Sequence, residues 1–261
     1  MKNKKVKTKN KFSFIQILQI ATIIALLAYM QVAVDTGSIS KVFIASPTMI
    51  IQDAIKIISD GTLLEHLSIT LQEVLAGYAL AAVVGIAVAL LWTLFPKLEE
   101  YSDVFCSAIM AIPKTAILPL LILWFGIGFQ SKVVLVFLFS VFQILYNTIT
   151  GVRQTDPKFL KVAKVFQASR LQTVFQIMIP SSLPSMFNGL KLAAATALTG
   201  VIFSEMQSAK GGLGFLLSEA QNLLNSARMF FIIILVTVIS VLFVKIVAVV
   251  EYSICHKWQS K

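Results

Sequence analysis

Few side chains in this sequence are suited to catalysis, and their spacing does not bring them together. The two histidines, His66 and His256, lie in distant parts of the chain. In the membrane topology predicted below they fall on opposite sides of the bilayer as interfacial residues, so they cannot bind one metal ion or complete a Ser-His-Asp triad. The adjacent acids Glu99 and Glu100 follow an apolar run and are typical of a solvated turn. We predict no catalytic residue, no metal site and no cofactor.

The glycine-rich segment KGGLGF, residues 210–215, does not match a nucleotide-binding motif. The phosphates of ATP are bound by GxxxxGK[ST], in which the lysine follows the glycines, whereas Lys210 precedes them here. We interpret these glycines as permitting a tight bend before the last apolar run. The chain is therefore expected to act as a conduit or a membrane partner, with any energy source in another molecule.

The elements that would position polar residues in this chain are long apolar helices. Of its 261 residues, 57% are hydrophobic and 13% are charged, and the apolar residues gather in long blocks. A helix of about 20 apolar residues crosses the hydrocarbon core of a bilayer with its backbone polar groups satisfied internally. We predict an all-α polytopic membrane protein with six transmembrane helices, at 12–34, 68–95, 102–125, 132–151, 185–205 and 228–250. The third is the weakest, because Pro113, Lys114 and Pro119 interrupt it.

The distribution of basic residues predicts that both termini are cytoplasmic, because Lys and Arg concentrate in cytoplasmic loops. The first eleven residues include six lysines, and the loop at 151–180 adds Arg153, Lys158, Lys161, Lys164 and Arg170. The chain ends with Lys257 and Lys261. The predicted outer loops contain only the basic residues Lys41, Lys56, Lys132, Lys210 and Arg228. Topology and anionic lipid explain the net charge of +10, so we expect contact with membrane lipid and no nucleic-acid partner.

Several polar residues lie within or beside the predicted spans, where charge is costly. Glu73 should face the bundle interior, a partner subunit or water, although reaching the membrane interface is the simpler interpretation. Lys114 and Lys191 could also reach headgroups through their long stems, but pointing inward they would favour an anionic substrate. Hydrogen bonds within the bundle are the simpler interpretation of Asn147, Thr196, Thr199 and Ser204. The candidates for a translocation pathway are Glu73, Lys114, Asn147, Thr196, Thr199 and Glu205.

The loop between the fourth and fifth predicted spans contains signals for two short helices. Asp156 is suited to cap the first helix, and Pro157 suits its first position. Ser169 and Gln172 have the spacing of a capping box at the start of the second. Pro180 and Pro184 are expected to delimit this second helix before the next span. The apolar residues of the first helix exceed what a free loop needs, so it should pack on lipid headgroups or on a soluble partner, and the residues alone favour neither.

The stretch KVAKVFQASRLQTVFQIMIPSSLPSMFNGLKLA, which begins at Lys161, resembles the EAA motif of permease subunits of binding-protein-dependent ABC importers. That motif opens with E-A-A, followed by a glycine and by I-x-L-P. Other segments agree in order: AIPKTAILPLLILWFGIGFQSKV, ILYNTITGVRQTDP, TGVIFSEM and GGLGFLL. The resemblance extends from about residue 63 to the C-terminus and is to the branch with permeases for nitrate, sulfonates, taurine and the pyrimidine precursor of thiamine.

The resemblance implies a type I ABC importer permease fold with cytoplasmic coupling helices. In that family the first loop helix sits in a groove of a separate cytoplasmic ATPase subunit. The matching coupling-loop residues here are Lys161, Ala163, Gln167, Ala168, Ser169, Arg170, Pro180 and Pro184. Lys161 stands where the family has glutamate, which reverses a charge at the ATPase contact. Gln167 stands where a glycine permits a left-handed turn, at a cost of about 1–2 kcal/mol if glutamine adopts it.

From these observations we predict a permease subunit of the cell membrane that receives a small solute from an extracytoplasmic binding protein. The resemblance also implies pairing with a second copy, and an acid near the position of Glu205 that helps close an outer gate. The expected divisions are 1–62 (basic tail, first span and outer loop), 63–250 (transmembrane domain) and 251–261 (cytoplasmic tail). The alternatives are an ion-driven secondary transporter, which should show inverted repeats and intramembrane acids, and a lipid-binding scaffold.

Overall fold

The computed structural model describes residues 14–208 and 210–259, with side chains as far as residue 255. Within this part of the chain five helices are long and apolar enough to cross a membrane, and a bent helix pair makes a sixth candidate. The prediction of an all-α protein with six spans is thus confirmed. The lysines of the first eleven residues, Lys261 and the side chains of His256 and Lys257 lie outside the described part of the chain.

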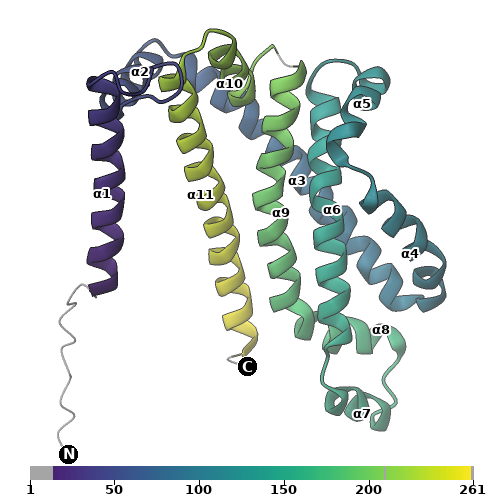
Figure 1. The fold of residues 1–261 in the computed structure, drawn as a ribbon. Helices are drawn as coiled ribbons and strands as arrows, with labels where there is room; N and C mark the ends of the chain where they lie inside the picture. Colours follow the sequence, from purple (N-terminus) through teal and green to yellow (C-terminus); the bar gives the residue numbers. More distant parts are fainter. Residues whose placement is uncertain (1–13, 209, 260–261) are drawn as a thin grey trace, which may run out of the picture.

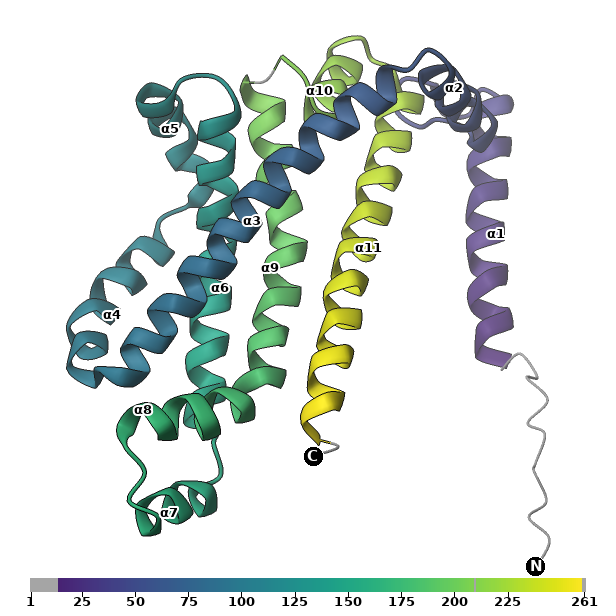
Figure 2. The same cartoon turned by 180° about the vertical axis from the view of Figure 1, so that it is seen from behind.

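The helices follow one another through short connections, and the long ones run alongside each other. Figures 1 and 2 show α6, α9 and α11 in a row, with α3 crossing on one side of them and α1 standing apart. Helices α2 and α10 lie across one end of the bundle (the α10 end), and α7 and α8 lie at the opposite end (the α7 end). The bounds are α1 Phe14–Asp35, α2 Pro47–Ser59, α3 Thr62–Leu94, α4 Pro96–Ala111, η1 Lys114–Ile117, α5 Leu118–Phe125, α6 Phe129–Arg153, α7 Pro157–Val165, α8 Arg170–Thr173, η2 Val174–Met178, α9 Ile179–Ser208, α10 Leu213–Asn222 and α11 Ser226–Gln259.

Small residues bring α6 close to both α3 and α9. A Cβ at Gly77 of α3 would lie 2.6 Å from the Cβ of Val136, and one at Gly189 of α9 would lie 2.7 Å from the Cβ of Asn147. Ala193 and Ala197 of α9 are fully buried. These small residues of the fifth predicted span therefore serve close helix packing, because only small side chains let backbones approach this closely.

The third predicted span is a broken helix. Helix α4 ends at Ala111, and the pair formed by α4 with η1 and α5 is bent by 85°. Pro113 is responsible, because a proline disfavours helical backbone at the residue before it, and Ile112 is extended with ψ of 131°. Pro119 does not interrupt α5, since it occupies the first turn, where a missing amide proton costs nothing.

The prolines after the loop do not end a helix, which corrects the prediction for Pro180 and Pro184. Helices α8, η2 and α9 follow without a gap, with Pro180 in the first turn of α9 and Pro184 inside it. The segment η2 is a π-helix, Val174–Met178. A wider π turn changes which carbonyls need an amide partner. Proline, which has no backbone N–H, can therefore follow the π turn within a continuous helix.

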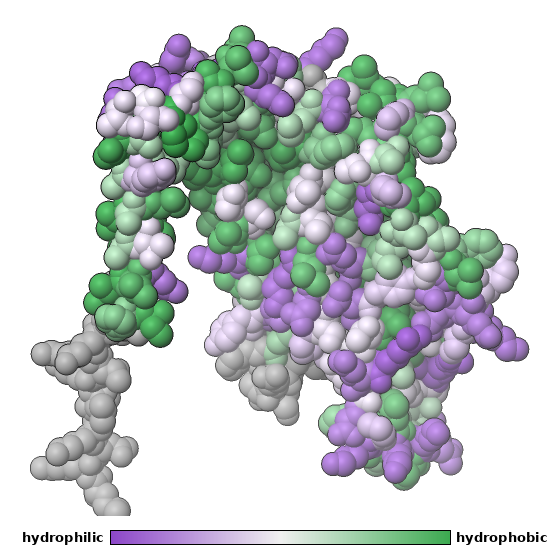
Figure 3. Space-filling view, in the orientation of Figure 1, coloured by the Kyte–Doolittle hydropathy of each residue, from purple (hydrophilic) through white to green (hydrophobic). Residues whose placement is uncertain are grey.

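Two further helices were not foreseen. The predicted outer loop before α3 contains α2, whose Ser46 side chain accepts a hydrogen bond from the amide of Met49 at its first turn. The glycine bend before the last span leads first into α10. In Figure 3 hydrophobic side chains cover α1 and much of the bundle, whereas hydrophilic ones line the α10 end, surround α7 and lie over the lower halves of α6 and α9. The face with α6 and α9 therefore differs in character from α1.

Candidate functional site

A buried ion pair joins α3 to α6 near the α10 end. Nζ of Lys132 lies 2.7 Å from Oε1 of Glu73, and the two residues are only 5% and 2% exposed. Glu73 therefore faces the interior, and the simpler interpretation that it reaches the membrane interface is wrong. Lys132 was assigned to an outer loop, but it lies in the first turn of α6. The other carboxylate oxygen of Glu73, Oε2, has no hydrogen-bond partner among the described residues.

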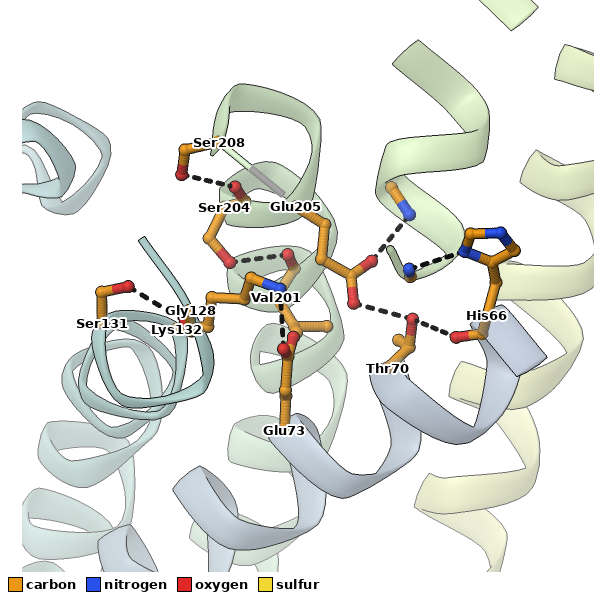
Figure 4. Close-up of polar contacts among 12 residues, drawn as sticks. His66, Thr70, Glu73, Gly128, Ser131, Lys132, Val201, Ser204, Glu205 and Ser208 are labelled. Carbon is orange, nitrogen blue, oxygen red and sulfur yellow. Dashed lines mark hydrogen bonds and ion pairs between the residues drawn. The ribbon is translucent and has the colours of Figure 1, made fainter. Parts of the chain in front are cut away.

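Glu205 belongs to a second buried group beside this pair, seen in Figure 4 between α3, α9 and the start of α10. Its Oε1 accepts a hydrogen bond of 2.8 Å from the hydroxyl of Thr70, and its Oε2 accepts one of 2.7 Å from the amide of Gly214. The hydroxyl of Thr70 in turn accepts from the amide of Leu213 at 2.8 Å. Glu205 thus links α9 to both α3 and α10.

His66 completes the cap of α10. Its Nδ1 accepts a hydrogen bond of 2.9 Å from the amide of Gly212, so that nitrogen carries no proton in this arrangement. The amides at 212, 213 and 214, which no helical carbonyl can satisfy, are bonded by His66, Thr70 and Glu205. Gly212 has φ of +107°, and a Cβ there would lie 2.2 Å from the carboxyl group of Glu205. The network fixes the connection between α9 and α10 through contacts with α3.

Most other predicted pathway residues bond to their own helix. The side-chain amide of Asn147 donates to the carbonyl of Gln143 at 2.8 Å, and the Ser204 hydroxyl to that of Val201. The Thr196 hydroxyl lies 3.2 Å from the carbonyl of Phe139 in α6 and also reaches carbonyls of α9. Thr199 is exposed, with one long contact of 3.5 Å to the carbonyl of Ala195.

The lysines near span ends have different surroundings. Lys191 is paired with Glu251 of α11 at 2.7 Å. Lys114, in η1, has its ammonium group 5.9 Å from the centre of the Phe139 ring. Glu99 is not a purely solvated residue, because it pairs with Arg153 of α6. Lys114 belongs to none of the four ion pairs among the described residues.

At the α7 end the predicted caps of the loop are confirmed. The side chain of Asp156 accepts a hydrogen bond of 2.8 Å from the amide of Lys158. Ser169 and Gln172 form a reciprocal capping box. The amide of Gln172 donates to the Ser169 hydroxyl at 3.2 Å, and the amide of Ser169 donates to the side-chain oxygen of Gln172 at 2.8 Å. Gln167 has φ of +51°, which is the left-handed turn that the resembled family makes with glycine. Glutamine therefore adopts this turn despite its side chain.

The turn at Gln167 closes with the pair of bonds that defines a Schellman motif. The amide of Ala168 donates to the carbonyl of Ala163 at 2.9 Å, and the amide of Gln167 donates to that of Lys164 at 3.1 Å. These bonds satisfy carbonyls at the end of α7, which helps to offset the strain at Gln167. Arg170 donates to the carbonyl of Thr93 at 3.4 Å and so connects the loop to the end of α3.

Helix α7 exposes a large apolar surface. Ala163 is buried against the rest of the loop, whereas Phe159, Val162, Val165 and Phe166 are 56%, 51%, 79% and 79% exposed. Lys161 is exposed on the same helix. The fixed backbone of the loop and its exposed apolar residues together form a surface suited to contact with another molecule.

Comparison with known proteins identifies the class of protein that this fold and loop define. Residues 73–254, more than half of the chain, match the family of binding-protein-dependent transport system inner membrane components. The taurine transport system permease protein of Escherichia coli (strain K12) is 27% identical over 78% of this chain and 76% of its own length. The formylaminopyrimidine transport permease protein of Halalkalibacterium halodurans is 32% identical over 65% of this chain and 68% of its own length.

A solved structure agrees with these matches at the level of fold. A chain of the MetNI methionine ABC transporter, in an inward-facing conformation, superposes with a TM-score of 0.58 at 20% identity, covering 74% of this chain and 94% of that one. The chain belongs to the family of binding-protein-dependent transport system inner membrane components. It is a multi-pass permease subunit of an ATP-driven ABC importer, a transport subunit by family. This membership decides against the ion-driven carrier and the lipid-binding scaffold.

Proposed function

We propose that α7 is the surface on which a separate cytoplasmic ATPase docks to drive transport. The observation that carries this proposal is the exposed apolar surface of α7 on a loop whose backbone is fixed by caps at each turn. A helix that transmits movement between subunits must be rigid before the partner binds, because a loop that orders on binding loses part of the interaction energy to conformational entropy. Family membership supports an ATPase and a binding protein as partners.

Charge defines what the ATPase surface should look like. Helix α7 carries Lys158, Lys161 and Lys164 and no acidic residue in its first turn. Lys161 stands where the resembled family has glutamate, so the groove that receives α7 should carry acidic side chains in place of basic ones. An apolar floor with acidic edges is thus the expected complement of this helix.

The docking proposal is tested by copurification of the ATPase with the full chain from gentle detergent. Phe166→Asp and Val165→Asp place a charge in the contact without touching the buried loop residue Ala163, whose replacement would disturb the loop itself. Lys56→Asp, at an exposed position in α2 at the opposite end, is the matched control. We expect loss of the ATPase with the α7 variants and retention with the control. Equal recovery from all variants would exclude α7 as the docking site.

We further propose that two copies of this chain pair to form the translocation pathway, with both termini and α7 in the cytoplasm and the α10 end facing the binding protein. The transmembrane domain then comprises residues 63–250, preceded by α1 as an additional anchor in contact with lipid. The substrate is a small solute of the type carried by the resembled branch: nitrate, a sulfonate, taurine or a thiamine pyrimidine. Attaching a membrane-impermeant label to Val165→Cys only from the cytoplasmic side would support this orientation, and labelling only from outside would reverse it.

A further inference from the structure

The broken third span leaves a positive charge at membrane depth. Irregular backbone is tolerated within a membrane only where it is buried in protein or lines a water-filled cavity, and intramembrane charges are typical of functional sites. Lys114 follows directly on the break between α4 and η1. Its ammonium group contacts the ring of Phe139, which lies about 15 Å from the first residue of α6 because a helix rises about 1.5 Å per residue. The charge is therefore far from the α10 end of α6.

This charge is not neutralised by an acid. The ion pairs among the described residues use Lys132, Arg153, Lys191 and Arg228, and none of them includes Lys114. An ammonium group at this depth is stabilised in part by the aromatic face of Phe139. The remaining stabilisation has to come from water or from an anion in an adjoining space.

Helix α9 presents a stripe of four side chains beside Phe139. Thr196, Thr199, Phe203 and Gln207 follow each other at intervals of three and four residues, which places them on one face of the helix. Thr196 contacts the carbonyl of the same Phe139 that Lys114 covers. The stripe and the lysine thus meet at one place on α6.

A cavity lies on each side of this stripe, and Phe203 borders both. One, of about 440 Å³, lies between α9 and α11 and is bordered by Thr199, Thr237 and Ser240. The other, also of about 440 Å³, lies between α9 and the η1–α5 segment and is bordered by Thr115 and Gln207. These volumes lie within the range of small-molecule sites, and their walls are apolar with a few hydrogen-bonding groups.

We propose that Lys114 and the α9 stripe form an anion-selective section of the translocation pathway. The site would take a small solute with one anionic group, such as a sulfonate, near Lys114, with Thr115 and Gln207 of the cavity beside the η1–α5 segment as hydrogen-bonding partners. The inference rests on the proposed function, in which two copies of this chain form a translocation pathway, and it adds that α6 and α9 line that pathway. We assign the selectivity to Lys114 because it follows directly on the break in the third span and its ammonium group lies over Phe139, beside the α9 stripe.

Chemical labelling tests this assignment without knowledge of the substrate. In a full-length chain with Cys106→Ser and Cys255→Ser, single cysteines are introduced as Thr199→Cys or Gln207→Cys. Each is treated, in membrane vesicles of both orientations, with sulfonatoethyl methanethiosulfonate or with its cationic trimethylammonioethyl counterpart. We expect the anionic reagent to react preferentially, and Lys114→Met to lower the ratio of the two rates on the order of tenfold, because a nearby unit charge shifts the local concentrations of anion and cation in opposite directions.

The controls separate the possible outcomes. Lys245→Met removes an exposed lysine of α11 and should leave the ratio unchanged, whereas Lys114→Arg should retain it. Leu26→Cys, on the lipid-exposed α1, should react with neither reagent, and Ser59→Cys at the exposed end of α2 should react with both. Unreactive Thr199→Cys and Gln207→Cys would show that the stripe lines no aqueous pathway, and a ratio insensitive to Lys114→Met would show that Lys114 does not set its charge. Either result overturns the anion site.

A transport assay connects the site to function. In proteoliposomes containing permease, ATPase and binding protein, taurine uptake should fall at least tenfold with Lys114→Met and persist with Lys114→Arg. Uptake that Lys114→Met leaves unchanged would overturn the site. Failure of the proposed function gives a different result: the ATPase would not copurify with the unsubstituted chain, whatever the labelling shows.

Discussion

The two ends of the molecule satisfy their polar groups in opposite ways. At the α10 end, His66, Thr70 and Glu205 bond three successive amides of α10 across helix boundaries, and Glu73 pairs with Lys132. At the α7 end, the caps are local, within a few residues of the chain, and the apolar side chains of α7 remain exposed.

This difference shows that the polar groups of the α10 end are satisfied within the chain, whereas the α7 end leaves a surface for another molecule. The α10 end holds buried charged and polar groups whose partners are on other helices, so removal of one partner leaves another group unsatisfied. The loop at the α7 end is shaped by local caps and by one bond from Arg170 to the carbonyl of Thr93, and it leaves apolar residues exposed for another molecule. We therefore expect substitutions at the α10 end to affect global stability and those in the loop to affect local order.

The largest expected effect is that of Lys132→Met. It leaves the carboxylate of Glu73 buried without a partner, which costs about 3–5 kcal/mol in the free energy of unfolding. Arg153→Met breaks the ion pair with Glu99 nearer the α7 end, where the Arg153 side chain is 68% exposed, and should cost less than about 1 kcal/mol. Unfolding in detergent, followed by circular dichroism, measures both. Adding Glu73→Leu to Lys132→Met should restore most of the lost stability. Equal costs for Lys132→Met and Arg153→Met would contradict the difference between the two ends.

The second prediction concerns the close contact of Gly212 with Glu205. Gly212→Ala introduces a methyl group into the carboxyl group of Glu205 at a positive φ, whereas Gly126→Ala, at φ of +77°, meets no atom within 4 Å. The control should cost about 1–2 kcal/mol for the backbone alone. Gly212→Ala should cost a further 1–3 kcal/mol or so through displacement of Glu205. A thermal unfolding series in detergent would show the difference, and identical midpoints would mean that the cap of α10 yields freely.

A smaller effect is expected from loss of the capping box in the loop. Ser169→Ala removes the acceptor for the amide of Gln172 and should cost about 1 kcal/mol in the stability of α8. Hydrogen exchange of residues 157–175, read by mass spectrometry, should become faster there and remain unchanged in α10. Ser253→Ala is the control, because that hydroxyl bonds only to its own helix at Val249. Faster exchange at the α10 end would contradict the independence of the two ends.

The smallest effect has the opposite sign. Gln167→Gly relieves the left-handed backbone at φ of +51° and should stabilise the loop by about 1 kcal/mol. Gln167→Ala serves as the control, since alanine keeps a Cβ and the same strain. Slower hydrogen exchange of the loop in the glycine variant alone is the expected result. Equal exchange in both variants would show that the Schellman bonds hold this turn without strain.

The contacts that could be predicted from the sequence are those whose partners lie close together in the chain. The cap at Asp156 and the capping box at Ser169 were predicted because each involves residues within three positions of one another. The turn at Gln167 was left open, because the family makes it with glycine. The prolines were misjudged, since neither Pro180 nor Pro184 reveals that a π-helix precedes it. Helix α2 was missed because its apolar residues are too few for a span and were taken as part of a loop.

The sequence by itself determined the spans, the capped loop and the family, because apolar length, local hydrogen bonds and ordered motifs are properties of short segments. Only the tertiary structure decided that Glu73 pairs with Lys132, that Glu205 caps α10 and that Lys114 lies over Phe139. The physical reason is that a buried charge indicates only that a partner is needed. Which residue provides it depends on which faces of distant helices meet.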